Sequence, residues 1–395
     1  MTADTWAGDG TIYLDHASTS AHKPEAVRLA MFDYLETVGA SPGRGGHRLA
    51  RRAEEITGAA RAALAQLFGI AHSADLAFTG NATHALNIAI KGSLRPGDHV
   101  VTTSLEHNSV LRPLESLRLA GRIGYDVVDT DPVRGYDLDR FEAAFRQETR
   151  LLVVNHASNV TGLVAPVREL AELAHRHGAL LLLDVSQTAG LLPVDVAELD
   201  VDLLAFTGHK GLHGPSGTGG LYVRDAAQVA PLYEGGTGTS SQVPRHPAAM
   251  PARFEAGTPN TLGIAGLGAA VRLLLRDGLD QERERQLALT ADCAARLADI
   301  SGVHVHHPVA GLPRVPLLSV LVDGLYPGEL GAVLDDRHAI LTRAGLHCAP
   351  LAHRSLGTAE HGTVRLSLGP TTTDRHIDTV VAALARLAAD HGRTR

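Results

Sequence analysis

The sequence predicts an α/β fold in which a large, doubly wound and mostly parallel seven-stranded sheet is joined to a smaller α+β domain at the C-terminal end. Between residues 75 and 225, short apolar runs alternate with amphipathic segments, as strands and helices do in doubly wound sheets. Several runs stop abruptly at polar residues, which is typical of buried parallel strands at their carboxyl ends. The predicted strands cover residues 75–79, 99–103, 123–128, 151–155, 179–184, 202–207 and 219–223.

The segments around these runs predict the helices that cover the sheet. Residues 47–69 carry apolar side chains at helical spacing, and Gly69 stands where that helix should stop. The other helices are predicted over residues 85–92, 109–120, 138–147 and 167–177.

A different pattern begins near residue 260 and indicates a second domain. Its helices are predicted over residues 262–275, 281–297, 328–336 and 376–387, and its strands over 303–306, 315–322 and 363–368. We therefore predict a large domain over residues 25–260 and a small domain formed by residues 1–24 and 261–395. Residues 225–259 are rich in Gly, Pro, Ser and Thr, so they predict an irregular segment that covers a site or reaches a neighbouring chain.

Composition excludes several classes of function. The net charge is −7 and the basic residues are scattered, so no nucleic-acid surface is expected. The chain has neither an apolar run long enough for a bilayer nor a signal-like N-terminus, which favours a cytoplasmic protein without a membrane partner. Two cysteines, Cys293 and Cys348, cannot form a disulfide framework or a four-cysteine zinc site, and no His-Glu-x-x-His spacing indicates a metal.

Two neighbouring strand ends carry the most informative pair of side chains. Asp184 ends one apolar run, and Lys210 follows the next run about two dozen residues later. Ligands of open α/β sheets bind at these carboxyl ends. An aspartate beside a pyridinium nitrogen and a lysine that can form a Schiff base are what pyridoxal 5′-phosphate (PLP) requires of its protein. A solvated lysine after a core strand is the alternative interpretation for Lys210 alone.

Other strand ends add polar groups to the same edge of the sheet. Thr83 lies in a turn that opens a helix, where free N–H groups and a hydroxyl suit a phosphate. His107 and Asn159 follow two further strands, Gln187 lies just past Asp184, and His209 precedes Lys210. A plain helix cap, a loop histidine and a turn asparagine are the alternatives for the first three. The glycines of residues 217–220 precede a strand, whereas a dinucleotide fingerprint follows one.

Taken together, these strings resemble the class V aminotransferase family of PLP fold type I, and within it the cysteine desulfurase and selenocysteine lyase branch. The resemblance extends over nearly the whole chain and rests on residues 13–17, 159–162, 184–187, 207–210 and 254–260. It implies that Lys210 holds PLP as a Schiff base, that Asp184 pairs with the pyridinium nitrogen, that Gln187 touches the phenolic oxygen and that His107, a catalytic residue, stacks on the ring.

The resemblance also implies how the phosphate and the substrate are held. Ala82, Thr83, Thr207 and His209 would bind the phosphate, and Thr258 or residues 237–239 would complete the site from the second subunit of a homodimer. Arg365 would clamp a substrate carboxylate with its planar fork, with Asn159 and Arg343 as further substrate contacts.

Cys348 lies in a string that resembles the loop of the nucleophilic cysteine in desulfurases. Its neighbours His347 and Arg343 make an electropositive setting, which favours a reactive thiolate. An inert buried thiol is the alternative, and it is the interpretation we give Cys293; a metal site of Cys348, His347 and His353 has too few ligands. Leu346 and His84 depart from the family's pattern, which bears on the substrate and leaves fold and cofactor unchanged.

The activity implied is removal of sulfur from L-cysteine, or of selenium from selenocysteine, to give alanine and a persulfide on Cys348, which a sulfur-acceptor protein would then receive. One alternative keeps PLP but makes the protein a C–S lyase, an epimerase or an aminotransferase of a specialised pathway. Another is a non-catalytic scaffold that binds a sulfur carrier.

Overall fold

The computed structural model describes residues 10–43, 45–238 and 242–391, and its main feature is a seven-stranded sheet. The strand order is β2-β8-β7-β6-β5-β3-β4. Six strands are parallel in direction, whereas β8 runs antiparallel to both of its neighbours. The predicted doubly wound sheet is thus confirmed. The strands are β2 Leu76–Thr79, β3 His99–Thr103, β4 Gly124–Val128, β5 Thr149–Asn155, β6 Leu180–Asp184, β7 Leu203–Thr207 and β8 Gly219–Val223.

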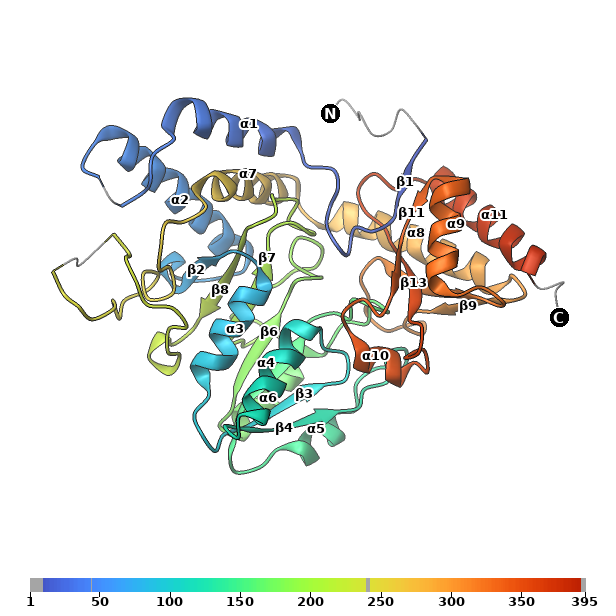
Figure 1. The fold of residues 1–395 in the computed structure, drawn as a ribbon, viewed down its shortest axis with the longest axis horizontal. Coiled ribbons are helices and arrows are strands. Elements are labelled where there is room, and N and C mark those ends of the chain that lie inside the picture. Colours follow the sequence, from blue (N-terminus) through green and yellow to red (C-terminus); the bar gives the residue numbers. More distant parts are fainter. Residues whose placement is uncertain (1–9, 44, 239–241, 392–395) are drawn as a thin grey trace.

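Helices cover both faces of this sheet (Figure 1). Alternate residues of each strand enter two separate apolar cores, as the period of two in a strand requires. One core contains side chains of α2 and α6, and the other contains side chains of α3 and α4. These helices are α2 Arg48–Leu67, α3 Ala82–Ser93, α4 Asn108–Leu119 and α6 Val167–Arg176, with the short α5 Leu138–Ala144 beside α6.

Two helices differ from the sequence prediction. Helix α1, Glu25–Asp33, which continues as the π-helix η1, Tyr34–Val38, was not predicted. Helix α7, Thr261–Asp277, lies beyond the predicted boundary at residue 260, yet it packs against α1 and α2 and contributes Leu267 to the core of the large sheet. Packing therefore favours a boundary between α7 and α8.

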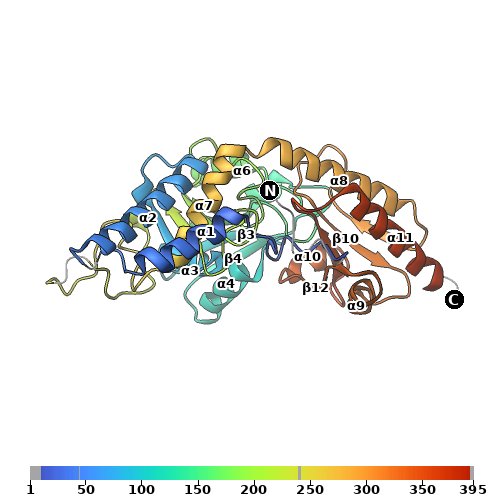
Figure 2. The same cartoon turned by 90° about the horizontal axis from the view of Figure 1, so that it is seen from above.

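The second part of the chain builds a four-stranded antiparallel sheet of order β12-β13-β10-β9. Helices α8 and α11 pack side by side against it, and the two domains lie next to each other along the long axis of the molecule (Figure 2). The three-residue β12 and the short α10 were not predicted. The strands are β9 Val303–His306, β10 Leu317–Val322, β12 Arg343–Gly345 and β13 Thr363–Ser367; the helices are α8 Asp280–Ala298, α9 Pro327–His338, α10 Pro350–Ser355 and α11 Asp374–His391.

The N-terminal segment links the two domains. Strand β1, Ile12–Tyr13, pairs in parallel with β11, Ile340–Leu341, of the small domain (Figure 1). A few residues later, the Ser20 N–H donates to the His209 carbonyl of the large domain at 2.9 Å. The segment between these two anchors therefore crosses the region where the domains meet.

The long segment after β8 is irregular, as predicted. Between β8 and α7 its described residues form only the 3₁₀ turn η3, Ala226–Gln228. None of the helices within the described ranges has both the length and the apolar character required to cross a membrane.

Candidate active site

The polar residues at the strand ends surround one cavity. It encloses about 230 Å³ at the carboxyl edge of the parallel strands, facing the small domain. Eleven of the predicted site residues line it: Ala82, Thr83, His107, Asn159, Asp184, Gln187, Thr207, His209, Lys210, Arg343 and Arg365. The convergence follows from topology, because neighbouring parallel strands deliver their ends to the same edge.

One end of the cavity is formed by the first turn of α3. Asn81 caps this helix by accepting from the His84 N–H at 2.9 Å. The N–H groups of Ala82 and Thr83 precede the first intrahelical hydrogen bonds, so they face the cavity as donors at the positive end of the helix. Thr207 ends β7 close by, and the buried His209 Nδ1 has no hydrogen-bond partner among the described residues. This donor set suits a phosphate.

The aspartate and the lysine line the same cavity. Asp184 is buried and lies opposite Asn155 in the register of β5 and β6. Its Oδ1 accepts from the Ser186 N–H at 2.9 Å and from the Ser186 hydroxyl at 2.5 Å. Burial lowers the pKa of Lys210 to about 8, an effect that the charge of Asp184 opposes. A large fraction of Lys210 is therefore a neutral nucleophile slightly above neutral pH.

His107 is held in one tautomer by the start of α4. The Ser109 N–H donates to Nδ1 at 3.1 Å, so Nδ1 is the acceptor and the neutral ring carries its proton on Nε2. Burial, and then the charge of Lys210, lowers the pKa of His107 to about 4. The ring is thus uncharged at neutral pH.

Gln187 lines the cavity but already has a partner. Its Nε2 donates to the carbonyl of Ala17 in the N-terminal segment at 3.1 Å. The expected contact with a phenolic oxygen remains a prediction.

Arg365 is fully buried in β13 and uses three of its five N–H donors. Nη1 donates to the Asn159 carbonyl at 3.0 Å, while Nη2 donates to Asp15 Oδ1 and to Ser18 Oγ, both at 2.8 Å. Its Nε has no partner in the described part of the chain. Burial lowers the pKa of Arg365 and Asp15 opposes the shift, so the guanidinium keeps its charge.

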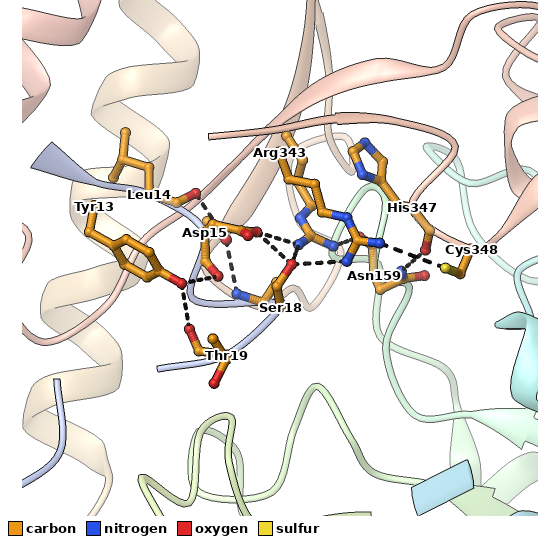
Figure 3. Close-up of polar contacts among 12 residues, drawn as sticks. Tyr13, Leu14, Asp15, Ser18, Thr19, Asn159, Arg343, His347 and Cys348 are labelled. Carbon is orange, nitrogen blue, oxygen red and sulfur yellow. Dashed lines mark hydrogen bonds and ion pairs between the residues drawn. The ribbon is translucent and has the colours of Figure 1, made fainter. Parts of the chain in front are cut away.

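Cys348 lies beside this cavity, at the far side of Arg343. The Nη2 of Arg343 is 3.7 Å from the Cys348 Sγ, and its Nη1 donates to Ser18 Oγ at 2.9 Å (Figure 3). The thiol is thus in contact with the permanent positive charge of Arg343.

The backbone at the cysteine is unusual. His347 and Cys348 have φ of 49° and 58°, a region that residues with side chains rarely adopt. Both of their carbonyls are held: His347 accepts from Asn159 Nδ2 and Cys348 accepts from the Asn108 N–H, each at 2.7 Å. Such conformations persist only where surrounding contacts fix them. The large domain thereby sets the position of the cysteine loop.

Thr258 is not brought into this cavity. It lines a separate hollow of about 650 Å³ together with Thr237 and Gly257. Thr239, the other end of the predicted phosphate stretch, lies outside the described residues.

Sequence reasoning missed three residues at the site. Asn155 ends β5 beside Asp184 and lines the cavity, so the strand-end argument that selected Asp184 applies to it too. Asp15 and Ser18 contact the two arginines, and no local pattern marks them, because their partners lie more than 300 positions away in the sequence.

Comparison with known proteins agrees with this geometry. The family model described as aminotransferase class-V matches residues 12–380. A probable cysteine desulfurase of Methanothermobacter thermautotrophicus is 35% identical over 95% of this chain and 94% of its own length. A probable cysteine desulfurase 2 of Mycobacterium leprae is 36% identical over 98% and 94%. The apo structure of cysteine desulfurase from Thermococcus onnurineus superposes with a TM-score of 0.89, at 32% identity, covering 96% of this chain and 95% of that one.

The fold and the site therefore define a PLP-dependent enzyme of fold type I, and the chain belongs to the aminotransferase class-V family. The residues present fit that cofactor. The cavity offers donors for a phosphate at the start of α3, a carboxylate at Asp184, an amine at Lys210 and an uncharged ring at His107.

We expect the Lys210 amine to react at unusually low pH. Rebinding of PLP to the apo-enzyme should accelerate as pH rises, with a midpoint near 8 and not near the ordinary lysine pKa of 10.5, because the amine must be neutral to attack the aldehyde. The measurement is the rate of the absorbance change on mixing, followed by borohydride reduction and peptide mapping. Lys23 and Lys91 are the other lysines of the chain, and a label on either would refute the assignment.

Proposed function

We propose that this chain is a PLP-dependent cysteine desulfurase that removes sulfur from L-cysteine and leaves it as a persulfide on Cys348. The observation that carries the proposal is the thiol of Cys348 against Arg343, at the edge of the cavity that Lys210 and Arg365 line. The names of the relatives point to the same reaction. Selenocysteine would be bound and cleaved by the same residues.

Each residue of the cavity then has a distinct task. PLP, when bound, withdraws electrons from the substrate Cα. Lys210 would hold PLP and would also accept the proton of the substrate Cα, because a pKa of about 8 suits a base near neutral pH. Asp184 would keep the pyridinium nitrogen protonated, and Ala82, Thr83, Thr207 and His209 would bind the phosphate. The neutral His107 would stack on the ring without adding a charge.

Sulfur transfer needs no external oxidant or reductant. The Cys348 thiolate attacks the substrate sulfur, the S–S bond forms, and the electron pair of the broken Cβ–S bond stays with the substrate carbon. That carbon takes up one proton, so L-cysteine and a protein thiol become alanine and a protein persulfide. A thiolate beside Arg343 is the nucleophile that this step requires.

Arg365 would bind the substrate carboxylate through the donors that remain. Asp15, Ser18 and Asn159 use three of its N–H groups, and the buried Nε is unused within the described chain. A carboxylate at Nε would satisfy a buried donor that is otherwise costly to leave unpaired. Asn159 Oδ1, also buried without a partner there, would lie beside the same substrate.

We further propose that the enzyme is a cytoplasmic homodimer whose persulfide is passed to an acceptor protein. Both cysteines are free thiols, as a reducing compartment favours. Leu29, Phe32 and Leu35 of α1 and η1 are each more than half exposed, which supports an interface at that end of the large domain. Thr258, which lines a separate hollow in its own chain, would complete the phosphate site of the partner.

Cys348→Ala should retain PLP and still bind L-cysteine but produce little alanine, because the leaving sulfur has no nucleophile. The matched control is Cys293→Ala, since Cys293 is buried in α8 and burial raises its pKa to about 12. Alanine, sulfide and pyruvate are scored together. Unchanged alanine in Cys348→Ala would refute the role of the thiol, and pyruvate as the main product of the intact enzyme would make it a C–S lyase.

Arg365→Lys keeps the positive charge but loses the planar guanidinium, which can bind a carboxylate through two N–H groups. We expect affinity for L-cysteine to fall by about tenfold or more, from one lost charge-assisted hydrogen bond, while PLP content stays normal. Arg296→Lys on the exposed face of α8 is the control. A variant that lost PLP but bound cysteine normally would place Arg365 at the phosphate.

Assembly should be linked to cofactor retention, because a ligand held by two chains stabilises the dimer by mass action. Sedimentation of the holoenzyme should give a dimer, and Thr258→Ala should release PLP faster than the exposed control Thr379→Ala. A monomer that keeps full PLP occupancy on dilution would contradict the shared site.

A further inference from the structure

The N-terminal segment places one hydroxyl between the two arginines of the site. Ser18 Oγ accepts from Arg343 Nη1 at 2.9 Å and from Arg365 Nη2 at 2.8 Å, and it donates to Asp15 Oδ1 at 2.7 Å (Figure 3). A hydroxyl has one donor and two acceptor sites. Ser18 therefore uses its full hydrogen-bonding capacity on these three groups.

The two arginines need such a partner. Arg343 and Arg365 lie directly opposite each other in the pairing of β12 and β13. Like charges in that arrangement repel. Arg365 has the carboxylate of Asp15 at 2.8 Å, whereas Arg343 makes no ion pair with a carboxylate of the described chain. Ser18 is the polar side chain that joins both guanidinium groups.

The guanidinium of Arg343 is planar, so a hydrogen bond that fixes Nη1 also constrains the position of Nη2. With Nη1 held by Ser18, Nη2 lies 3.7 Å from the thiol of Cys348. The same hydroxyl occupies one Nη2 hydrogen of Arg365 and leaves Nε for a ligand. One side chain therefore controls the orientation of both groups.

We propose that Ser18 is a positioning residue that aligns Arg365 for the substrate carboxylate and Arg343 for the Cys348 thiolate, and so couples substrate binding to thiol reactivity. The proposal rests on the proposed function and adds to it a residue that contacts the thiol only through Arg343. Without the hydroxyl, the two positive groups lose their shared acceptor, and Arg343 is free to turn away from Cys348.

The test measures each arginine separately in the holoenzyme. Thiol reactivity is the rate of alkylation of Cys348 by iodoacetamide across a pH series, read by mass spectrometry of its peptide. Carboxylate binding is the dissociation constant of L-alanine, read from the absorbance of the bound cofactor. Neither readout requires desulfuration.

We expect Ser18→Ala to slow alkylation of Cys348 at neutral pH and to weaken L-alanine binding, each by about threefold to tenfold, the effect of one typical intramolecular hydrogen bond. Ser18→Thr keeps the hydroxyl and should restore both quantities. Ser355→Ala removes a hydroxyl of α10 that bonds Asp129 and Ser104 and touches neither arginine, so it should change neither.

A Ser18→Ala enzyme in which only one quantity changes would show that the serine serves a single arginine and would overturn the coupling. The coupling would also be overturned if neither quantity changes in Ser18→Ala. It would likewise be overturned if Ser18→Thr has a normal unfolding transition but does not restore the alkylation rate and L-alanine binding. An intact enzyme that makes no alanine from cysteine would instead overturn the proposed function, and the two readouts on Ser18 would still be measurable.

Discussion

The ion pair between the buried Arg365 and the partly exposed Asp15 is the interaction on which the arrangement of the site depends. Arg365 has no exposed surface, and its partner comes from the N-terminal segment, 350 positions earlier in the chain. Removing one member of a buried pair costs about 3–5 kcal/mol, because the remaining charge is left without compensation. The pair thereby keeps the N-terminal segment at the junction of the two domains, where Ser18 and Ala17 line the cavity and Gln187 finds its partner.

Burial sets the charges around the cofactor position. It lowers the pKa of His107 and of His209 to about 4, so neither ring is charged at neutral pH. It raises the pKa of Glu106, at the end of β3, to about 8, so this carboxyl is mostly protonated there. Glu106 therefore adds no full negative charge to that of Asp184. The permanent charges of Arg343 and Arg365 lie on the opposite, small-domain side, where a carboxylate and a thiolate would have to be held.

The large sheet was predictable because its strands are long apolar runs and its ligand edge follows from parallel topology. Eleven of the eighteen residues that line the cavity were found by that reasoning and by resemblance to a family. Strands β1, β11 and β12 have two or three residues, too few for a period to show. Helix α7 is apolar on most of its surface, so its pattern did not indicate that it belongs to the large sheet. Asp15 and Ser18 were beyond reach for a different reason: their roles depend on pairings across the entire chain.

The pairing of β1 with β11 also has a consequence for biosynthesis. Strand β1 has to wait for residues 340–341 before it can pair, and Asp15 has to wait for Arg365. At roughly 5–20 residues per second, that interval is tens of seconds. During this interval the large sheet can form, since its strands lie between residues 76 and 223. The part of the small domain that carries both arginines and the cysteine cannot form yet. The nascent chain would thus form the phosphate-binding edge of the large sheet well before it contains the groups that act on a substrate. A prematurely terminated product would expose this edge of the sheet and would lack the reactive thiol.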